Sequence, residues 1–483
     1  MDTIVEQKGE GFKELEEKIY RIVCRMGAAI TREILKAKDE EIFQGRDKSR
    51  YESKGFRKTS IKTVYGPVEY SRRVYKTDTR DGKTGYVYLL DEAMGMEKVG
   101  LMSVNLAGKI ADAATEASYR KAASLITGTT GNPVSAQGAW LVIQKIGERI
   151  SAEEDQAVSQ MNAGHTEGRK AVGVLFEEMD GTWIRQQGRR HEKMPKMEVK
   201  VSTTYEGWDA GMEAAKRSTL AGRHMLAGIE RAGTFHEKHE AEIRKHYDAD
   251  GISLRILNGD GGNWIGDPYD PDVVVQLDPF HVHKEIRRLI ADKKAVRCIE
   301  ELLAGKDADG ALSYIQTYAE SVASDDPGDK REGNALALYK YLSGNRESLI
   351  PWTERGIETP EPPEGIIYKG MGVQEAENCS VITMRMKHRR MRWSRQGGNN
   401  MAKALYRRAN GELHETIGRY QELFRPVEVL EAIEALSAAK APRKDGKGSP
   451  YAELSRHSVP LLGAALTEGR KAFRDIVSGK GAV

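Results

Sequence analysis

Cysteine is scarce in this sequence, which has only Cys24, Cys298 and Cys379 among 483 residues. An odd and scattered set provides neither a disulfide framework nor a zinc site of the CxxC type, so we expect buried free thiols. No apolar run approaches the roughly 20 residues that cross a bilayer. The first residues also lack a basic segment followed by an apolar one, the pattern of a secretory signal. These absences predict a cytoplasmic protein without a membrane segment.

Net charge is also small, because 75 Lys and Arg residues nearly balance 72 Asp and Glu residues and leave +3. Contacts with nucleic acid depend on local patches rather than on the sum, so the distribution of charge along the chain is what matters. The composition, 39% hydrophobic and 30% charged, is typical of a globular protein. A chain of this length predicts roughly two to four folded units.

The N-terminal part divides into a helical arm and a basic ribbon. Apolar residues recur at helical spacing in residues 10–45, which predicts a long amphipathic helix in an arm of residues 1–45 that packs internally or dimerises. Residues 46–95 favour β-structure around a turn at Gly66-Pro67, and residues 46–76 hold ten Lys or Arg against three acids. Contact with a DNA backbone and a solvated hairpin both remain open for this ribbon.

Residues 96–165 resemble a helix-turn-helix region. One helix is expected through Ile126, followed by a turn rich in Gly, Thr, Asn and Pro and a second helix from Val134 with Ser135 as its N-cap. In such a motif the start of the second helix enters the major groove, which would place Gln137 and Trp140 near DNA. A plain αα-hairpin is the alternative.

The following residues predict an α/β core. The expected strands are residues 171–180, 181–188, 196–208, 253–260 and 273–278, and the expected helices are residues 223–248 and one from near His283. The order βββαβαβα is that of an RNase H-like fold, a mixed five-stranded sheet with flanking helices. An α-helical insertion at 284–365 separates the two parts of this core, 166–283 and 366–425. Residues 426–483 predict one helix and a flexible tail.

Three acids occupy positions suited to metal chemistry. Asp180 and Asp260 each end an apolar run, where a strand would present a carboxylate at its end, and Glu375 opens a helix-like stretch that leads into basic residues. Phosphodiester cleavage needs charge stabilisation on the attacking and leaving oxygens, and two cations about 3.5–4 Å apart supply both. Carboxylates suit Mg²⁺ or Mn²⁺. The pattern therefore predicts two ions per site, held by these three residues.

Other acids compete for the same roles, since a lone Asp at a strand end is usually a turn or cap residue. Glu377 competes with Glu375 on the same helix. The remaining competitors are Glu177, Glu178, Asp267, Asp270 and Asp272. Spacing alone leaves these alternatives open.

Three ordered blocks of the sequence carry a family resemblance. They are LNGDGGNWI at 257–265, LDPFHVHKEI at 277–286 and GMGVQEAENCSVITMRMKHRRMRWSRQGGNNM at 370–401. These blocks resemble those of bacterial insertion-sequence transposases of the ISLre type, related to the Mutator-like DDE superfamily, and the resemblance extends from about residue 100 to 425. It implies a DDE triad at Asp180, Asp260 and Glu375, the last favoured over Glu377 by its spacing to Arg385.

The same resemblance implies a D-x-x-H element after the second acid, here Asp278 to His281, and a helical insertion before the Glu. His281 would orient a metal ligand or contact phosphate, or be a structural histidine, whereas His283 is expected to be structural. Related families often carry N-terminal cysteines in a zinc-binding arrangement. Residues 46–76 have none, so a DNA-binding module there would work without metal.

A basic segment follows the expected catalytic Glu. Residues 378–410 contain nine Lys or Arg and no acid, which indicates phosphate binding. Trp393 stacks on a base or anchors the core, and Trp352 has the same two alternatives, with the core favoured. The residues of this segment expected to contact DNA are Arg385, Lys387, Arg389, Arg390, Arg392, Trp393 and Arg395.

Together these features predict a DNA transposase that binds terminal inverted repeats, cleaves the strands and joins them to target DNA. Its partner would be double-stranded DNA, and its location would be the cytoplasm in association with the nucleoid. Because two ends must be cut and joined, we expect a homodimer or larger assembly. The alternatives are a DDE-type endonuclease without strand transfer and a transposase-derived DNA-binding regulator.

Overall fold

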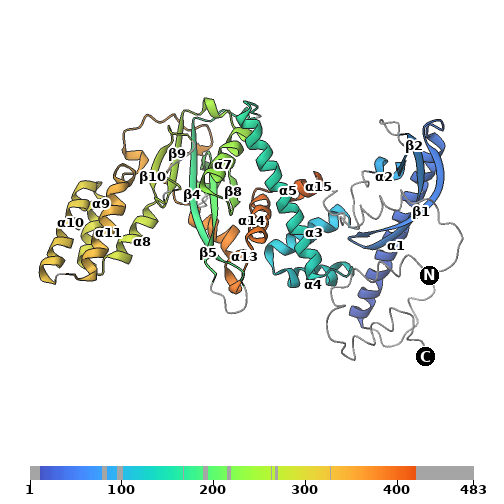
Figure 1. The fold of residues 1–483 in the computed structure, drawn as a ribbon, viewed down its shortest axis with the longest axis horizontal. Coiled ribbons are helices and arrows are strands. Elements are labelled where there is room, and N and C mark those ends of the chain that lie inside the picture. The colour runs from blue at the N-terminus through green and yellow to red at the C-terminus, as the bar shows by residue number, and fades with distance from the viewer. Residues whose placement is uncertain are drawn as a thin grey trace. The chain divides into compact units, whose positions relative to one another are not determined.

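The computed structural model describes residues 11–78, 84–94, 102–166, 168–188, 194–214, 219–262, 264–266, 270–326 and 328–419. Figure 1 shows the arrangement of its helices and strands. The helix and tail expected for residues 426–483 lie outside the described residues. The three cysteines are free thiols, but the expectation that they are buried is wrong, since Cys24 and Cys298 are partly exposed and Cys379 is exposed. Among the helices that are described, none combines the length and apolar character needed to cross a bilayer.

The N-terminal arm is one long helix, α1 (Phe12–Gly45), beside a three-stranded antiparallel sheet. The strands are β1 (Glu52–Thr63), β2 (Gly66–Asp78) and β3 (Thr84–Val87), followed by the short helix α2 (Leu89–Ala93). The basic ribbon is thus confirmed, although its tight turn lies between Thr63 and Gly66, which pair with each other, rather than at Gly66-Pro67.

Ion pairs neutralise part of the ribbon. Arg73 of β2 bonds the buried carboxylate of Asp39 at 2.8 Å, and Arg72 pairs with the buried Asp91 of α2. These contacts fasten α1 and α2 to the sheet. The apolar stripe of α1 nevertheless remains solvent-exposed at Ile19, Val23, Met26, Ile30 and Ile34, so dimerisation of this helix stays a prediction.

Three helices follow, α3 (Val104–Glu116), α4 (Tyr119–Thr130) and α5 (Ala136–Asn162). The predicted N-cap is confirmed, because Ser135 Oγ accepts a hydrogen bond from the Gly138 amide at 2.9 Å. The turn between α4 and α5 contains Gly131 in the left-handed region, at φ 66°. Its Asn132 side chain is buried and donates to the Thr63 carbonyl at 2.6 Å, which joins the turn to the ribbon.

The core is a mixed five-stranded sheet in the order β10-β9-β4-β5-β8. Strand β4 (Val174–Arg185) pairs in parallel with β9 (Leu254–Gly259), which pairs in parallel with β10 (Val274–Leu277). On its other side β4 pairs antiparallel with β5 (Lys196–Tyr205), and β5 pairs antiparallel with β8 (His224–Gly228).

Three details of the expected core are wrong. The order βββαβαβα includes a helix between the last two core strands, whereas the described residues between β9 and β10 form none. Residues 171–188 do not form two strands with a turn at Asp180-Gly181, because β4 continues through both residues and stays paired with β5 as far as Arg185. The start of the expected helix at 223–248 is instead strand β8, and helix α7 (Ala232–His246) begins later. Pairing with β5 overrides the local helical pattern there.

Helices cover this sheet. Helix α7 packs against α5 and β5, and α14 (Arg395–Ala409) packs against α5 and β8, followed by α15 (Leu413–Arg419). Apolar residues from these helices and the sheet form one continuous core. The sequence segments on the two sides of the insertion are therefore held together by helix packing on the same sheet.

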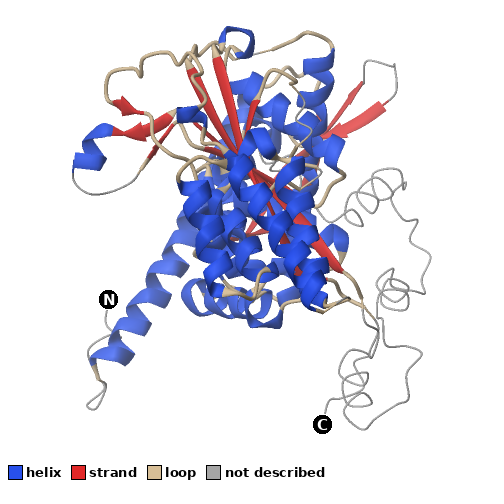
Figure 2. Cartoon of the chain, turned by 90° about the vertical axis from the view of Figure 1, so that its left-hand side faces the viewer, coloured by secondary structure: helices blue, strands red, loops and turns tan. Residues whose placement is uncertain are grey.

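The helical insertion has its own apolar core and lies beside β10 in Figure 1, and its helices face the viewer in Figure 2. Its helices are α8 (Pro279–Leu289), α9 (Lys293–Ala304), α10 (Ala308–Asp325) and α11 (Lys330–Gly344), with 3₁₀ turns η2 (Arg346–Leu349) and η3 (Trp352–Glu354). The expected insertion is thus helical, but its first helix starts at Pro279 rather than near His283. The reason is local, since the Asp278 side chain caps it by accepting from the Phe280 amide at 3.0 Å.

A second, smaller sheet of three strands is separate from the five-stranded sheet. It consists of β11 (Ile366–Ile367), β6 (Gly207–Asp209) and β7 (Leu220–Ala221), with the short helix α6 (Ala210–Ala214) after β6. Trp352 is buried and packs edge-on against Phe176 of β4 at a centroid distance of 5.6 Å. This placement supports the core role of Trp352 rather than base stacking.

Candidate metal centre

Asp180 lies where β4 extends beyond its parallel neighbour. The last parallel pair joins Met179 to Gly259, so Asp180 stands just past the carboxyl end of β9. Its buried carboxylate accepts hydrogen bonds from the Gly181 amide at 2.7 Å and from the Asn378 side chain at 2.6 Å. The side chain is therefore held in one orientation, at the edge of the parallel strands.

Asp260 follows β9 directly and is partly buried. Its side chain accepts the Gly262 amide at 2.8 Å, and its backbone carbonyl accepts the Tyr341 hydroxyl of α11 at 2.9 Å. The neighbouring Gly261 has φ 74°, a conformation that favours glycine. The helical insertion thus fixes the loop that carries the second acid.

Glu375 belongs to the first turn of α12 (Gln374–Glu377) and is exposed. This helix continues as a π-helical turn, η4 (Asn378–Thr383), then α13 (Met384–Met386) and the 3₁₀ turn η5 (His388–Arg390). The π-helical turn contains Asn378, the donor to Asp180. Such turns are frequent at functional sites.

Glu178 positions this helix, a role that the sequence analysis missed. Its fully buried carboxylate accepts the backbone amides of Gly372, Val373 and Gln374 at 3.0–3.2 Å. Tyr205 also donates to it at 2.6 Å. The available signal was its spacing, because Glu178 lies two residues before Asp180 on the same face of β4.

Asp180, Asp260 and Glu375 line one cavity of about 350 Å³. Ligand atoms of Asp180, His281 and Glu375 lie within 4.8 Å of one another, close enough to share a metal ion. Asp278 lies behind His281, with 3.9 Å between its carboxylate and the imidazole. The residues lining the cavity include Asp180, Trp183, Asp260, His281, Lys284, Glu285, Glu375, Asn378 and Lys387.

The electrostatics of this cavity disfavour an ionised Asp180. Its pKa is raised to about 6, mainly by burial and also by the carboxylates of Asp260 and Glu375, whereas His281 and the Gly181 amide oppose the shift. Burial also raises the pKa of Asp278. Several carboxylates around one cavity repel each other, and a bound cation would relieve that repulsion.

Three of the acids that competed for these roles, Glu377, Glu177 and Asp270, pair with basic residues elsewhere. Glu377 forms an ion pair with Arg223 at 2.7 Å. Glu177 is buried between Arg255 and His239, and Asp270 also contacts Arg255 at 3.2 Å. Asp272 is exposed, and Asp267 lies outside the described residues. The geometry thus separates Glu375 from these alternatives.

The basic segment at 378–410 is only partly a surface. Lys387, Arg390, Arg392 and Arg395 are exposed. By contrast, Arg385 is buried and donates to the Ala114 carbonyl at 2.7 Å, so its guanidinium does not face solvent. The side chain of Arg389 is not among those that the structure describes.

The expectation that nothing acidic balances this segment is wrong at three positions, one of which is Arg408, which pairs with Glu116 of α3. Lys403 is fully buried and bonds Glu154 at 2.7 Å, and Arg407 bonds Glu153 at 3.2 Å and also Glu412. Glu153 and Glu154 belong to α5, about 250 residues earlier in the sequence. Lys403 and Arg407 therefore join α14 to α5 instead of binding phosphate.

The other predicted site residues are likewise divided between buried or structural side chains and exposed ones. Trp393 is buried, donates from Nε1 to the Met386 carbonyl at 2.9 Å and packs edge-on against Tyr119, which supports its role as a core anchor. His283 bonds Glu300 at 3.1 Å, as expected of a structural histidine. Gln137 and Trp140 are exposed on the first turns of α5, as contact with a groove requires.

Asp180 generates a pH prediction. In the native state without metal, raising its pKa from 3.8 to about 6 corresponds to about 3 kcal/mol of lost stability at pH 7. The native state holds the proton more tightly, so this loss is absent below pH 4 and complete above about pH 6. Relative to wild type, Asp180→Asn should therefore gain up to about 3 kcal/mol in free energy of unfolding between about pH 4 and 7.

Urea denaturation in a chelator at both pH values measures this gain. The control is Asp272→Asn, which removes an exposed carboxylate. A difference between Asp180→Asn and wild type that stays constant with pH would contradict the shift.

Glu178 generates a second prediction. Glu178→Gln replaces an acceptor by an amide group that cannot accept all three backbone N–H bonds, so the start of α12 should open more readily. We expect hydrogen exchange at residues 372–375 to accelerate at least about 10-fold, from a loss of about 1.4 kcal/mol in local stability. Glu377→Gln is the matched control on the same helix. Unchanged exchange in Glu178→Gln would show that the cap does not hold α12.

Comparison with known proteins adds the family. A search of curated proteins gave no match. The family described as "Uncharacterised protein family (UPF0236)" matches residues 5–422, which include every element described above. The match spans most of the chain, so the protein belongs to the UPF0236 family.

Proposed function

We propose that this protein is a DNA transposase with an RNase H-like core and a DDE site at Asp180, Asp260 and Glu375. One observation carries the proposal, namely that three acids from distant parts of the sequence line one cavity together with His281. They reach it from β4, from the end of β9 and from the helix after the insertion. The resemblance to ISLre-type transposases implies the same three acids.

The sheet supports the RNase H-like assignment. Its first three core strands form an antiparallel meander. The fourth strand pairs in parallel with the first, and the fifth pairs in parallel with the fourth, which gives the spatial order 3-2-1-4-5. In that order the first and fourth strands are adjacent, and their ends bring Asp180 and Asp260 together. A helical insertion between the fifth strand and the third acid also agrees with the resemblance.

The donor set fits Mg²⁺ or Mn²⁺, because carboxylate oxygens are the ligands that these ions prefer. Asp180, Asp260 and Glu375 would hold two ions per site, with His281 beside them. When bound, the ions would stabilise charge on the attacking and leaving oxygens of a phosphodiester. Lys387 lines the cavity and would pair with a phosphate of the bound strand.

Exposed basic and aromatic side chains support DNA as the partner. Arg390, Arg392 and Arg395 follow the helix that carries Glu375, and Gln137 and Trp140 lie at the start of α5. Phosphate contacts by the first group would position the duplex, and base-edge contacts by the second would select the terminal repeats. Two active sites are needed to cut and join both ends, so we propose a homodimer or larger assembly on DNA.

The test is a cleavage and joining assay with Mg²⁺, a target plasmid, and labelled DNA that carries the presumed ends of the element, taken from the sequence on either side of the gene. Wild type should release 3′-hydroxyl ends and join them. Asp180→Asn, Asp260→Asn and Glu375→Gln should each lower cleavage by at least about 100-fold, because each removes charge stabilisation from the transition state. Glu377→Gln, a matched change on the same helix, should retain activity.

Each other outcome has a defined meaning. Cleavage without joining would replace the transposase by an endonuclease, and binding without cleavage would indicate a DNA-binding regulator. Full activity in all three variants would show that the site lies elsewhere.

A further inference from the structure

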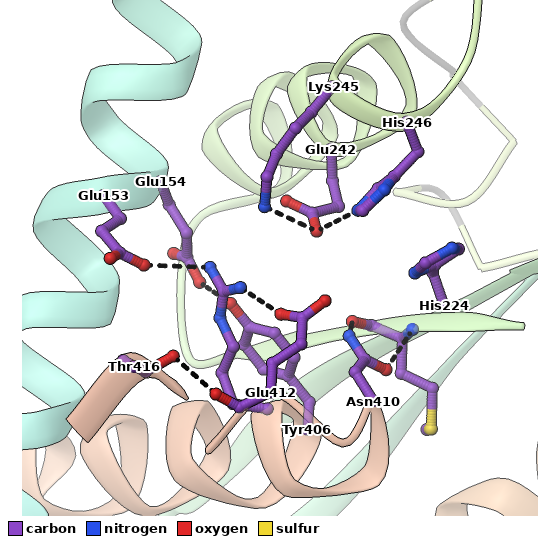
Figure 3. Close-up of polar contacts among 12 residues, drawn as sticks. Glu153, Glu154, His224, Glu242, Lys245, His246, Tyr406, Asn410, Glu412 and Thr416 are labelled. Carbon is purple, nitrogen blue, oxygen red and sulfur yellow. Dashed lines mark hydrogen bonds and ion pairs between the residues drawn. The ribbon is translucent and has the colours of Figure 1, made fainter. Parts of the chain in front are cut away.

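A second group of metal-binding side chains lies at β8, outside the cavity of Asp180. His224 comes from β8, His246 ends α7, and Glu412 precedes α15 (Figure 3). Their ligand atoms lie within 4.8 Å of one another. Residues from three separate segments thus converge on one point without any role in the proposed DNA chemistry.

The donors are those of a transition-metal site. Two imidazoles and one carboxylate are a recurrent ligand set for Zn²⁺, with the fourth position left to water. The imidazoles of His224 and His246 stack with centroids 4.0 Å apart and planes 20° apart. Among the described residues, the buried Nδ1 of His224 has no hydrogen-bond partner. A buried nitrogen with an unsatisfied bond is costly unless something binds it.

Neighbouring groups hold the other two side chains in place. Nε2 of His246 lies 3.0 Å from a carboxylate oxygen of Glu242. A carboxylate bonded to one ring nitrogen fixes the tautomer and leaves the other nitrogen free to coordinate, as is common around bound metals. The close-up in Figure 3 shows this contact and the second bond of Glu242 to Lys245.

Glu412 is held through its backbone and its side chain. Its amide donates to the Arg407 carbonyl at 2.8 Å, and its own carbonyl accepts the Thr416 hydroxyl at 2.9 Å. The Arg407 guanidinium bonds one carboxylate oxygen and also pairs with Glu153. The second carboxylate oxygen of Glu412 is left for a cation, and Glu153 offsets the charge that Arg407 brings.

We propose that His224, His246 and Glu412 bind one divalent transition-metal ion of the Zn²⁺ type. Tetrahedral bonds of about 2.0–2.1 Å require ligand atoms about 3.4 Å apart, so binding would draw the three side chains inward. The ion would join β8 and α7, from before the insertion, to the segment between α14 and α15, from after it. The same segment already holds β8 through Asn410, which bonds both backbone groups of Met225 at 2.9 and 3.0 Å.

The experiment measures Zn²⁺ and Co²⁺ binding to the full-length chain. The starting protein carries Asp180→Asn and Glu375→Gln, which removes the other cluster as a competing site. Competition with a chromophoric chelator measures the affinity and the stoichiometry, and we expect one ion per chain. The Co²⁺-loaded protein should show the intense visible absorption of four-coordinate Co²⁺. His246→Ala and Glu412→Gln should each weaken binding at least about 100-fold, and Glu242→Gln about 10–100-fold.

His283→Ala is the control, because it removes a histidine bonded to Glu300 in the insertion and should leave binding unchanged. If His246→Ala does not fold, Glu412→Gln decides, since it keeps the shape of the side chain. The proposal fails if the starting protein binds neither ion, or if Glu412→Gln binds both as tightly as the starting protein. These outcomes are independent of any DNA cleavage.

Discussion

The buried carboxylate of Glu178 is the contact on which the candidate metal centre depends. It accepts three successive backbone amides at the start of α12 and so ties the helix after the insertion to β4. Asp180 lies two residues further along β4, and Asn378, one turn into the same helix, donates to it. Glu375 is therefore placed opposite Asp180 by bonds on either side of it. A buried carboxylate is costly without donors, and here the amides supply them.

The acids of the cavity lie close together although the repulsion between their negative charges destabilises the native state. Asp180 is buried beside two other carboxylates, and its raised pKa expresses the cost of that arrangement. The surrounding structure tolerates this cost because the contacts that hold the cavity in shape do not depend on the charge of Asp180. Tyr341 of the insertion holds the Asp260 backbone, and Lys403 and Arg407 join α14 to α5. A carboxylate cluster that is disfavoured alone but rigidly held is what a site prepared for divalent cations requires.

The sequence was sufficient for features whose signals are local. The Ser135 cap, the helical insertion and the grouping of Asp180, Asp260 and Glu375 could all be predicted, the last because two of the ordered sequence blocks contain Asp260 and Glu375 and the resemblance that they carry implies Asp180 as the first acid. Features that depend on distant partners could not. Strand β8 is recognisable only when β5 is beside it, and β4 continues past Gly181 because β5 remains paired with it. Lys403 and Arg407 resembled a phosphate-binding surface because their acidic partners on α5 lie about 250 residues away, and the other partner of Arg407, Glu412, lies just beyond the segment.

The most direct test of the proposed two-metal site is anomalous diffraction from crystals grown with Mn²⁺ and a DNA end. We predict two Mn²⁺ peaks roughly 3.5–4 Å apart, coordinated by Asp180, Asp260 and Glu375. Lys387 should lie within reach of a phosphate of the same strand. Peaks at other residues, or none in this cavity when DNA is bound, would contradict the assignment.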